Sequence, residues 1–511
     1  MKKYYEYIKE IKSKSLFKGL LGFGLFAEKI PPFLTSESFY KFILKKSFPY
    51  SDNKPTDYIR YSNMRNINIP RPLAIPEPFS YANQIKLLET NWTEIISHFE
   101  NHTKDQNFKV SRIHIRKLKD RDSLFEMSYR NFETDGNPED KIFIKSRYIA
   151  TADIATCFPS IYSHSISWAL VGKELAKRES GKKFSSNWFN QLDFYTRNLK
   201  YGETNGLLIG PHSSNLVSEI ILCCIDYYLI KLGYTFYRNV DDYTCYTKSY
   251  EQAEKFFIDL SEILKEYELS LNSKKSCIAQ LPQASVTNWV TKLNHFNFKE
   301  RYKTHSGKVG VRLNELKGFL DFAVETMLEN QSDAAVLNYA IKSLSDKHLG
   351  NKAHQYYIDR VHHLTLLYPY LTLILENKVF KSHNVKKERI KEIANDLYEL
   401  GMSKKNYEVC SYAVYYSIKY KFQLIEEKKI KEESIKSGDC IFMMIAYLYD
   451  KKYQRKGYLK EYKELAEKLY KSDFDRYWLF CFEVLTQNEL KGKYKELKKA
   501  NVSFVLPKYA S

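Results

Sequence analysis

Two adjacent carboxylates, Asp241 and Asp242, are the residues of this chain best suited to chemistry. They separate two short segments, 235–240 and 243–246, that are rich in aromatic and β-branched residues and contain no Pro or Gly. Such segments are typical of strands, so a β-hairpin with both acids at its turn is predicted. Acid pairs in turns are common because Asp is a favoured turn residue, and the pair alone indicates only a solvated turn.

A third carboxylate upstream changes this interpretation. The segment 148–152 predicts an apolar strand that ends at Asp153, and the chain then turns at Pro159. Phosphoryl transfer to a nucleotide uses two Mg²⁺ ions about 3.5–4 Å apart, and hard cations prefer carboxylate oxygens. The sequence therefore predicts a site for two Mg²⁺ ions, with Mn²⁺ as a substitute. Its metal ligands are expected to be Asp153 and Asp241 as bridging groups, Asp242 as the supporting acid, and Ile154.

Candidate nucleotide-binding residues lie between the acids. Phe158 follows Asp153 by five positions, where an aromatic ring under the incoming sugar would exclude a ribose 2′-hydroxyl; the alternative is a core residue beside Pro159. The segment 206–214 is a glycine-containing turn before a helical pattern, and such a turn lets the backbone approach a nucleotide closely. Gly210 and Pro211 are the candidates there.

A lysine after the hairpin is a further catalytic candidate. Ser249 and Gln252 have the spacing of a capping box that opens a helix. An Asn-x-x-Lys run, Asn272 to Lys275, follows that helix. Lys275, rather than Lys274, is expected to protonate the leaving pyrophosphate or hold its charge, although a lone lysine in so basic a chain is more often a solvated charge.

The order of these elements resembles that of a reverse-transcriptase-like right hand, and in particular the abortive-infection (Abi) reverse transcriptases. The similarity covers roughly residues 15–300. It is carried by Cys157–Ile166, Gly206–Ser214, Val240–Asp242 and Trp289–Asn294, with Gly22–Phe26 and Lys29–Pro32 resembling the prophage-borne branch.

The resemblance implies a fold, an activity and further site residues. The fold is an α+β reverse-transcriptase-like palm and fingers over 1–300 (fingers about 45–150, palm about 141–300), followed by an all-α, HEAT-like helical-repeat domain over 301–511. The activity is DNA synthesis from dNTPs without a template, primed on a hydroxyl of the protein, in phage defence. The single-stranded product would stay covalently attached, and the protein would form a trimer or hexamer. Cations for the triphosphate would come from Arg116, Lys119 and Arg147.

Two departures from the usual reverse-transcriptase pattern fit this unusual activity. Asn239 stands where an aromatic residue usually precedes the paired acids, and Ile209 replaces the glutamine common in templated enzymes. The priming group is expected to be a tyrosine, because a phenol loses its proton more readily than an aliphatic hydroxyl, with an ordinary pKa of about 10. The candidates are Tyr4, Tyr5, Tyr7, Tyr50, Tyr58 and Tyr61.

The composition agrees with a polyanionic partner. A net charge of +19 favours binding to nucleic acid through counterion release. The 42 Tyr, 31 Phe and 5 Trp residues offer stacking surfaces for single-stranded bases, although more of them will form cores. The eight cysteines show no paired spacing, which indicates reduced thiols in the cytoplasm and no zinc site. No membrane-spanning run of about twenty apolar residues is visible.

From about residue 314 to the last residue, apolar side chains recur with the spacing of an α-helix. Leu316, Phe319 and Leu320 begin this pattern, and Gly401 is expected to end a later helix. The segment 441–449 is apolar all round and should be buried. Serial amphipathic helices suggest a helical repeat, but without a visible period a plain helical bundle remains an alternative.

Two other functions compete. A templated reverse transcriptase of a retron or mobile intron would share the palm, but no nuclease motif with paired Cys or clustered His follows residue 300. A helical-repeat scaffold with a non-catalytic palm is the second alternative, and the intact Asp153, Asp241 and Asp242 argue against it.

Overall fold

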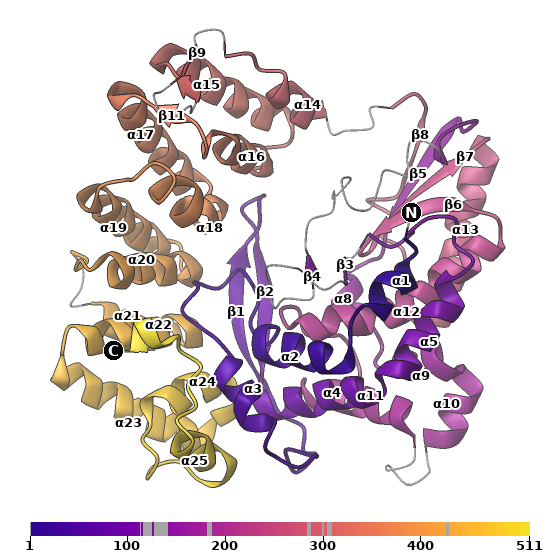
Figure 1. Ribbon diagram of the computed structural model, residues 1–511, viewed down its shortest axis with the longest axis horizontal. Coiled ribbons are helices and arrows are strands. Elements are labelled where there is room, and N and C mark those ends of the chain that lie inside the picture. The colour runs from indigo at the N-terminus through magenta and orange to yellow at the C-terminus, as the bar shows by residue number, and fades with distance from the viewer. Residues whose placement is uncertain are drawn as a thin grey trace.

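A computed structural model describes residues 2–112, 114–115, 125–126, 142–180, 187–283, 288–298, 301–303, 309–425 and 429–510. Figure 1 shows a palm on one side, an arc of helices on the other, and a two-stranded ribbon between them. The predicted fold class, an α+β part followed by helices, is confirmed. One small sheet interrupts the helical part, because β9 (Arg301–Lys303), β10 (Val309–Val311) and β11 (His348–Leu349) pair in the order β11-β10-β9.

The palm is built on a four-stranded antiparallel sheet in the order β6-β7-β5-β8. Residues of alternate positions, among them Ala150, Phe236 and Cys245, are buried on one face of the sheet, where the long helices α12 and α13 pack. The period of two along each strand therefore decides which residues the helices cover. The strands are β5 (Tyr148–Asp153), β6 (Thr235–Asn239), β7 (Asp242–Thr247) and β8 (Cys277–Gln280).

The palm helices surround this sheet. Half of the predicted capping box of α13 is present, since the Ser249 hydroxyl accepts a hydrogen bond from the Gln252 backbone at 3.3 Å. The Gln252 side chain accepts from the Lys248 amide instead of the Ser249 amide. The helices are α8 (Cys157–Ser160), α9 (His164–Val171), α10 (Lys173–Ser180), α11 (Trp188–Asn198), α12 (His212–Lys231) and α13 (Tyr250–Glu266).

The α12 helix is long and apolar enough to cross a membrane by length and composition, but 78% of its most apolar window is buried inside the structure. It is the central helix of the palm.

The N-terminal part carries a β-ribbon and a helical base. The proline-rich segment forms an antiparallel pair of strands in which Ile59 pairs with Ile75, and Pro78 starts the next helix, where its missing N–H costs nothing. The elements are α1 (Tyr4–Lys9), α2 (Ser13–Phe23), α3 (Glu37–Ile43), β1 (Tyr58–Met64), β2 (Pro70–Pro76), α4 (Pro78–Thr90), α5 (Trp92–Thr103), β3 (His114–Ile115) and β4 (Phe125–Glu126).

The C-terminal part is a succession of packed helices. Neighbours such as α19 and α20 pack side by side along the arc (Figure 1), and the all-apolar segment predicted to be buried is the core of α22. The elements are α14 (Asn288–Asn294), α15 (Leu313–Glu329), α16 (Ala335–Leu344), α17 (Asn351–Leu367), α18 (Thr372–Ile374), α19 (Lys387–Ser403), α20 (Tyr407–Tyr420), α21 (Ile430–Ser437), α22 (Cys440–Lys452), α23 (Lys456–Ser472), α24 (Phe474–Val484), α25 (Gly492–Lys499) and α26 (Pro507–Ala510). A 3-10 turn (Pro369–Leu371) and a π-helical turn (Leu375–Phe380) flank α18.

Gly401 does not end its helix, which corrects the expectation from sequence. The α19 helix continues to Ser403, and a Cβ atom at Gly401 would lie 2.5 Å from the Cys410 sulfur of α20. The glycine is needed there because two helices approach each other closely.

Residues 33–39, after α2, pack against residues 503–506 of the C-terminal part at the base of the molecule. Leu34 and Val505 form an antiparallel bridge, and the Leu506 amide donates to the Phe33 carbonyl at 2.8 Å. Phe504 packs its ring against Phe39 and Trp478. The helical arc is therefore joined to the rest of the protein at its lower end as well as through α14.

Candidate active site

The three predicted acids lie together at one edge of the palm sheet. Asp153 ends β5 and is paired in register with Asp242, the first residue of β7. Asp241 occupies the hairpin turn, and its carbonyl accepts a hydrogen bond from the Ile154 amide at 3.1 Å. Val240 adopts a φ of 59°, which closes the turn in the left-handed region and makes β6 end one residue earlier than the sequence suggests.

Asp153 is held by two side chains from the loop after α13. Asn272 donates to one carboxylate oxygen at 2.8 Å, and Lys275 donates to the other at 2.9 Å. The backbone fixes this loop, because the Asn272 amide donates to the Asp153 carbonyl at 2.8 Å. The structure thus brings Lys275 to the acids, although its side chain is 59% exposed.

The pKa values reflect crowded carboxylates. Burial raises the pKa of Asp242 to about 7, and the charges of Asp241 and Asp153 add to the effect. Burial also raises the pKa of Asp241. Burial likewise acts on Asp153, but the hydrogen bonds from Lys275 and Asn272 outweigh it and lower the pKa of this carboxyl. Three acids so close to one another favour a bound cation.

The donor set fits divalent metal ions. The carboxylates of Asp153, Asp241 and Asp242 offer the oxygen ligands that Mg²⁺ prefers. Ile154 has an apolar, fully buried side chain, so it could contribute only its main-chain carbonyl. Bound there, two such ions would lower the pKa of an attacking hydroxyl and hold phosphate oxygens.

A buried arginine supports the acidic turn from below. Arg238 is completely buried, and its guanidinium donates to the Val240 carbonyl at 2.7 Å. The same group pairs with two buried carboxylates of α12, Glu219 at 2.9 Å and Asp226 at 2.6 Å. Burial acts against this guanidinium, but the two carboxylates outweigh it and raise the pKa of Arg238. The position of the turn is therefore coupled to α12.

The glycine-containing loop packs between α8 and the ribbon. The Leu207 amide donates to the Phe158 carbonyl at 2.7 Å, so the loop is joined to the segment that follows Asp153. Gly210 has a φ of 138°, and a Cβ atom there would lie 2.5 Å from the Ala74 carbonyl oxygen of β2. Only glycine allows this approach. Pro211 directly precedes α12, and Phe158 is 8% exposed within α8.

Of the three predicted triphosphate cations, Arg147 is the one within the described residues. Arg116 and Lys119 lie outside the described residues. Arg147 precedes β5, six positions before Asp153, which places it roughly 20 Å away at the other end of the strand. Arg147 is therefore not brought to the acids. A different cation, Arg71 of the ribbon, acts on the acids. Its charge lowers the pKa of Asp241, against the effect of burial.

Sequence reasoning did not select Arg71, Arg238 or the acids of α12. Glu219 and Asp226 are seven residues apart on α12, and the residues between them are apolar. Acids at that spacing share one helix face, and buried acids need a cation. The seven-residue spacing of Glu219 and Asp226 is therefore the sequence feature that indicates a buried cation beside them, the place that Arg238 occupies.

A large cavity adjoins the glycine loop. Its volume is about 860 Å³, and it lies between the β-ribbon, the loop 207–209 and the start of α20. Basic and aromatic side chains line one part of it, and two acids, Glu408 and Asp439, and several apolar side chains line the rest. The basic and aromatic residues include Arg60, Lys200, Lys404, Lys405, Tyr58 and Tyr407. Such a lining suits a single strand of nucleic acid, because cations contact the backbone and rings stack on bases.

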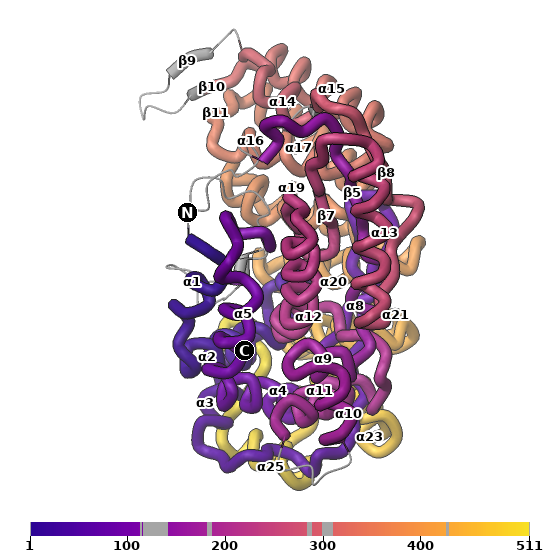
Figure 2. Tube along the Cα trace, turned by 90° about the vertical axis from the view of Figure 1, so that its right-hand side faces the viewer, coloured from indigo at the N-terminus to yellow at the C-terminus, as the bar shows by residue number. Residues whose placement is uncertain are grey.

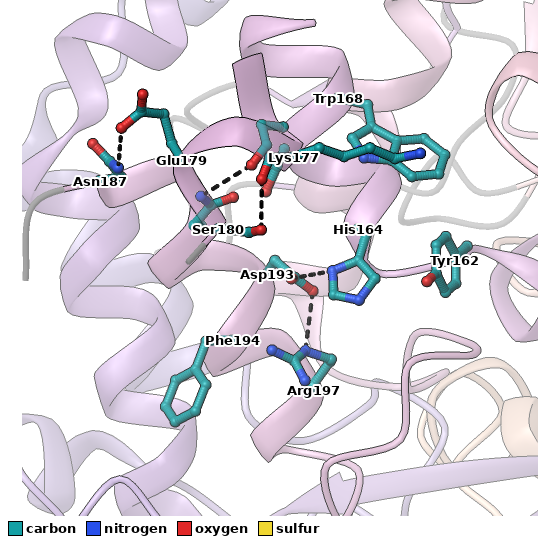
Figure 3. A pocket seen from close by; sticks show the side chains of 13 residues that line it. Tyr162, His164, Trp168, Lys177, Glu179, Ser180, Asn187, Asp193, Phe194 and Arg197 are labelled. Atoms are coloured by element: carbon teal, nitrogen blue, oxygen red, sulfur yellow. Dashed lines mark hydrogen bonds and ion pairs between the residues drawn. The ribbon is translucent and has the colours of Figure 1, made fainter. Parts of the chain in front are cut away.

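A second cavity, of about 390 Å³, lies among α9, α10 and α11 (Figure 3). His164 approaches one oxygen of the buried Asp193 at 2.6 Å, and Arg197 approaches the other at 3.3 Å. His164 and Arg197 thus both contact this carboxylate. The cavity is separate from the three acids, since its lining comes only from residues 162–197.

The candidate priming tyrosines differ in accessibility. Tyr4 and Tyr61 are 2% and 8% exposed, and burial raises the pKa of both phenols. Burial also raises the pKa of the half-buried Tyr50 to about 12. Tyr5 and Tyr7 are half-buried on α1, and Tyr58 lines the 860 Å³ cavity.

Comparison with known proteins identifies the domain. Residues 95–306 match the family model of the reverse transcriptase (RNA-dependent DNA polymerase). The chain therefore contains a reverse transcriptase domain, which includes the palm sheet, all three acids and Lys275. No curated protein matches the chain.

Solved structures of similar fold include telomerases. Apo telomerase from Candida tropicalis, truncated from the C-terminal domain, is 13% identical over 46% of this chain and 52% of that chain, with a TM-score of 0.30. Telomerase from Candida albicans in complex with a fragment of telomeric RNA is 10% identical over 69% of this chain and 63% of that chain, with the same TM-score. The chain thus spans about half to two thirds of these proteins, and likeness this low carries no argument about function.

Proposed function

We propose that this protein is a DNA polymerase of the reverse-transcriptase type that extends a primer hydroxyl of its own chain without a template, in an abortive-infection system against phage. The observation that carries the polymerase part is the set of three carboxylates at one edge of the palm sheet, within a matched reverse transcriptase domain. The untemplated, protein-primed mode rests on the resemblance to Abi reverse transcriptases. The helical arc would correspond to their HEAT-like domain.

The proposed chemistry assigns one task to each residue. Asp153, Asp241 and Asp242 would hold two Mg²⁺ ions at the reacting phosphate. Lys275 lies within hydrogen-bond distance of Asp153, so it would hold or protonate the leaving pyrophosphate. Phe158 would exclude ribonucleotides, and the backbone around Gly210 and Pro211 would contact the nucleotide.

The surroundings of the site support a single-stranded product. The basic and aromatic cavity beside the glycine loop has the lining that binds single strands with little sequence preference. Among the candidate primers, Tyr58 is favoured because it lines this cavity beside Arg60, whose guanidinium lies 4.3 Å from the ring centroid. Buried Tyr4 and Tyr61 would need local opening to act.

The test is incorporation of labelled dNTPs by the purified protein with Mg²⁺ and neither primer nor template. We expect labelled DNA that stays on the protein in denaturing detergent and is released by protease. Asp241→Asn and Asp153→Asn should abolish incorporation, because each removes an anionic ligand at constant volume. Asp346→Asn, which alters an aspartate that is 76% exposed in its side chain, is the matched control and should keep full activity.

A templated reverse transcriptase is the second candidate, favoured by the description of the matched family. DNA free of protein, made only when primer and template are added, would select this candidate. If wild-type protein makes no DNA in either assay, the helical-repeat scaffold with a non-catalytic palm is the remaining alternative.

Mass spectrometry of nuclease-trimmed protein should find a residual nucleotide on one tyrosine peptide, and Tyr58→Phe should remove it if Tyr58 is the primer.

A further inference from the structure

Two helices behind the palm sheet place four metal-binding side chains together. His98 and His102 are one turn apart on α5, and Cys223 and Cys224 are adjacent on α12. One ligand atom from each residue lies within 4.8 Å of the others. Both views of the chain show α5 alongside α12 (Figures 1 and 2). The cysteine spacing predicted no zinc site, because these side chains come together only in the fold, and 125 residues separate His98 from Cys223.

The distances match those of a tetrahedral zinc site. Zinc binds cysteine sulfur at about 2.3 Å and histidine nitrogen at about 2.0–2.1 Å, so neighbouring ligand atoms should be roughly 3.3–3.8 Å apart. His98 Nε2 lies 3.4 Å from Cys223 Sγ and 3.8 Å from Cys224 Sγ. His102 Nε2 lies 3.6 Å from Cys224 Sγ. All three separations fall in this range.

The contacts around the ligands favour a metal as well. The second ring nitrogen of His102, Nδ1, is 2.8 Å from the His98 carbonyl, so it can donate there and leave Nε2 free to bind. Metal-binding histidines are commonly oriented in this way. His98 Nε2 also lies 2.9 Å from the Ile220 carbonyl. Metal binding would replace that hydrogen bond.

The burial, the charge and the donor atoms of the four side chains favour zinc. His98, Cys223 and Cys224 are 6%, 1% and 1% exposed, while His102 is half-buried and gives access. Two thiolates and one divalent cation sum to zero charge, which suits a buried site. Nitrogen and sulfur donors favour zinc over Mg²⁺.

We propose that His98, His102, Cys223 and Cys224 bind one structural Zn²⁺ ion that joins α5 to α12. Four protein ligands leave no open position, as in structural rather than catalytic zinc sites. Cys223 lies between Glu219 and Asp226, the two partners of Arg238. The ion would therefore fix the part of α12 that supports the acidic turn. This proposal is independent of the polymerase function.

The test is the metal content of full-length protein purified without chelator from zinc-supplemented medium. An Asp153→Asn/Asp241→Asn background excludes zinc at the three acids. We expect about one zinc per chain, lost in Cys223→Ser/Cys224→Ser and weakened at least tenfold in His102→Gln. Cys481→Ser alters a fully buried cysteine of α24 outside the group and should keep the zinc. Chelator should lower the unfolding temperature of the parent protein.

Cobalt provides a readout that needs no variant. Co²⁺ bound to the chelator-treated protein should show the visible bands of tetrahedral cobalt and the near-ultraviolet band of cobalt–thiolate bonds. A parent protein without zinc, and without a thiolate band after cobalt addition, would overturn the proposal and leave a hydrogen-bonded His–Cys cluster. Full zinc retention by the double cysteine variant would overturn it equally.

Discussion

Replacing Arg238 by methionine should separate the stability of the palm from the position of its acids. The change leaves Glu219 and Asp226, which are 0% and 1% exposed, without a counter-charge. Removing one partner of a buried ion pair costs about 3–5 kcal/mol. The Val240 carbonyl also loses its charged donor, an interaction of about 1.5–3 kcal/mol. If this free energy is lost entirely from the positioning of the acidic turn, the rate of incorporation falls about 10- to 150-fold.

Urea unfolding and nucleotide incorporation should be measured on three variants. Arg238→Met should unfold at lower urea and lose activity. Arg238→Met/Glu219→Gln/Asp226→Asn removes the unpaired charges, so it should regain most of the stability but not the activity. Arg360→Met is the control, because its ion pair with Asp321 is partly exposed and should contribute only about 0–1 kcal/mol. An Arg238→Met variant as stable as the parent, or full activity in the triple variant, would contradict the coupling of the turn to α12.

Three further outcomes are expected. Because burial and like charges raise the pKa of Asp242 to about 7 in the metal-free protein, Mg²⁺ affinity should rise with pH and level off above about 7, with proton release measurable by calorimetry; a flat profile from pH 6 to 8 would contradict this. Phe158→Ala should increase ribonucleotide incorporation relative to dNTP incorporation, and unchanged discrimination would make Phe158 a core residue only. Burial raises the pKa of Glu408 from 4.5 to about 7. The free energy of unfolding of the protein should therefore fall as pH rises through that interval, by on the order of 3 kcal/mol in total. Glu408→Gln should therefore be the more stable protein in urea at pH 8 but not at pH 4, and equal midpoints at both pH values would show that burial does not penalise this carboxylate.

Local patterns predicted much of the palm. The alternation around Asp241 and Asp242 predicted the hairpin, and the apolar segment before Asp153 predicted the neighbouring strand, because strand faces are set by a period of two. The left-handed Val240 was not predicted, since a residue without glycine's freedom adopts that conformation only when its surroundings impose it.

The features that the sequence did not predict depend on contacts between residues far apart in the chain. Nothing near Arg238 says that its partners come from α12, and nothing near His98 points to cysteines 125 residues away. Gly401 was assigned to a helix end because glycine commonly stands there, whereas the space it provides is occupied by Cys410 of the next helix. Such contacts depend on how elements pack, and a single sequence does not record that.

The bridge between Leu34 and Val505 has a consequence for synthesis on the ribosome. The two residues are 471 positions apart (505 − 34). At about 5–20 residues per second, roughly 25–95 s pass between them. During that time Phe39 lacks the Phe504 ring that covers it in the finished protein. The base of the molecule therefore closes only after Phe504 has emerged, and until then this side of the Phe39 ring remains uncovered.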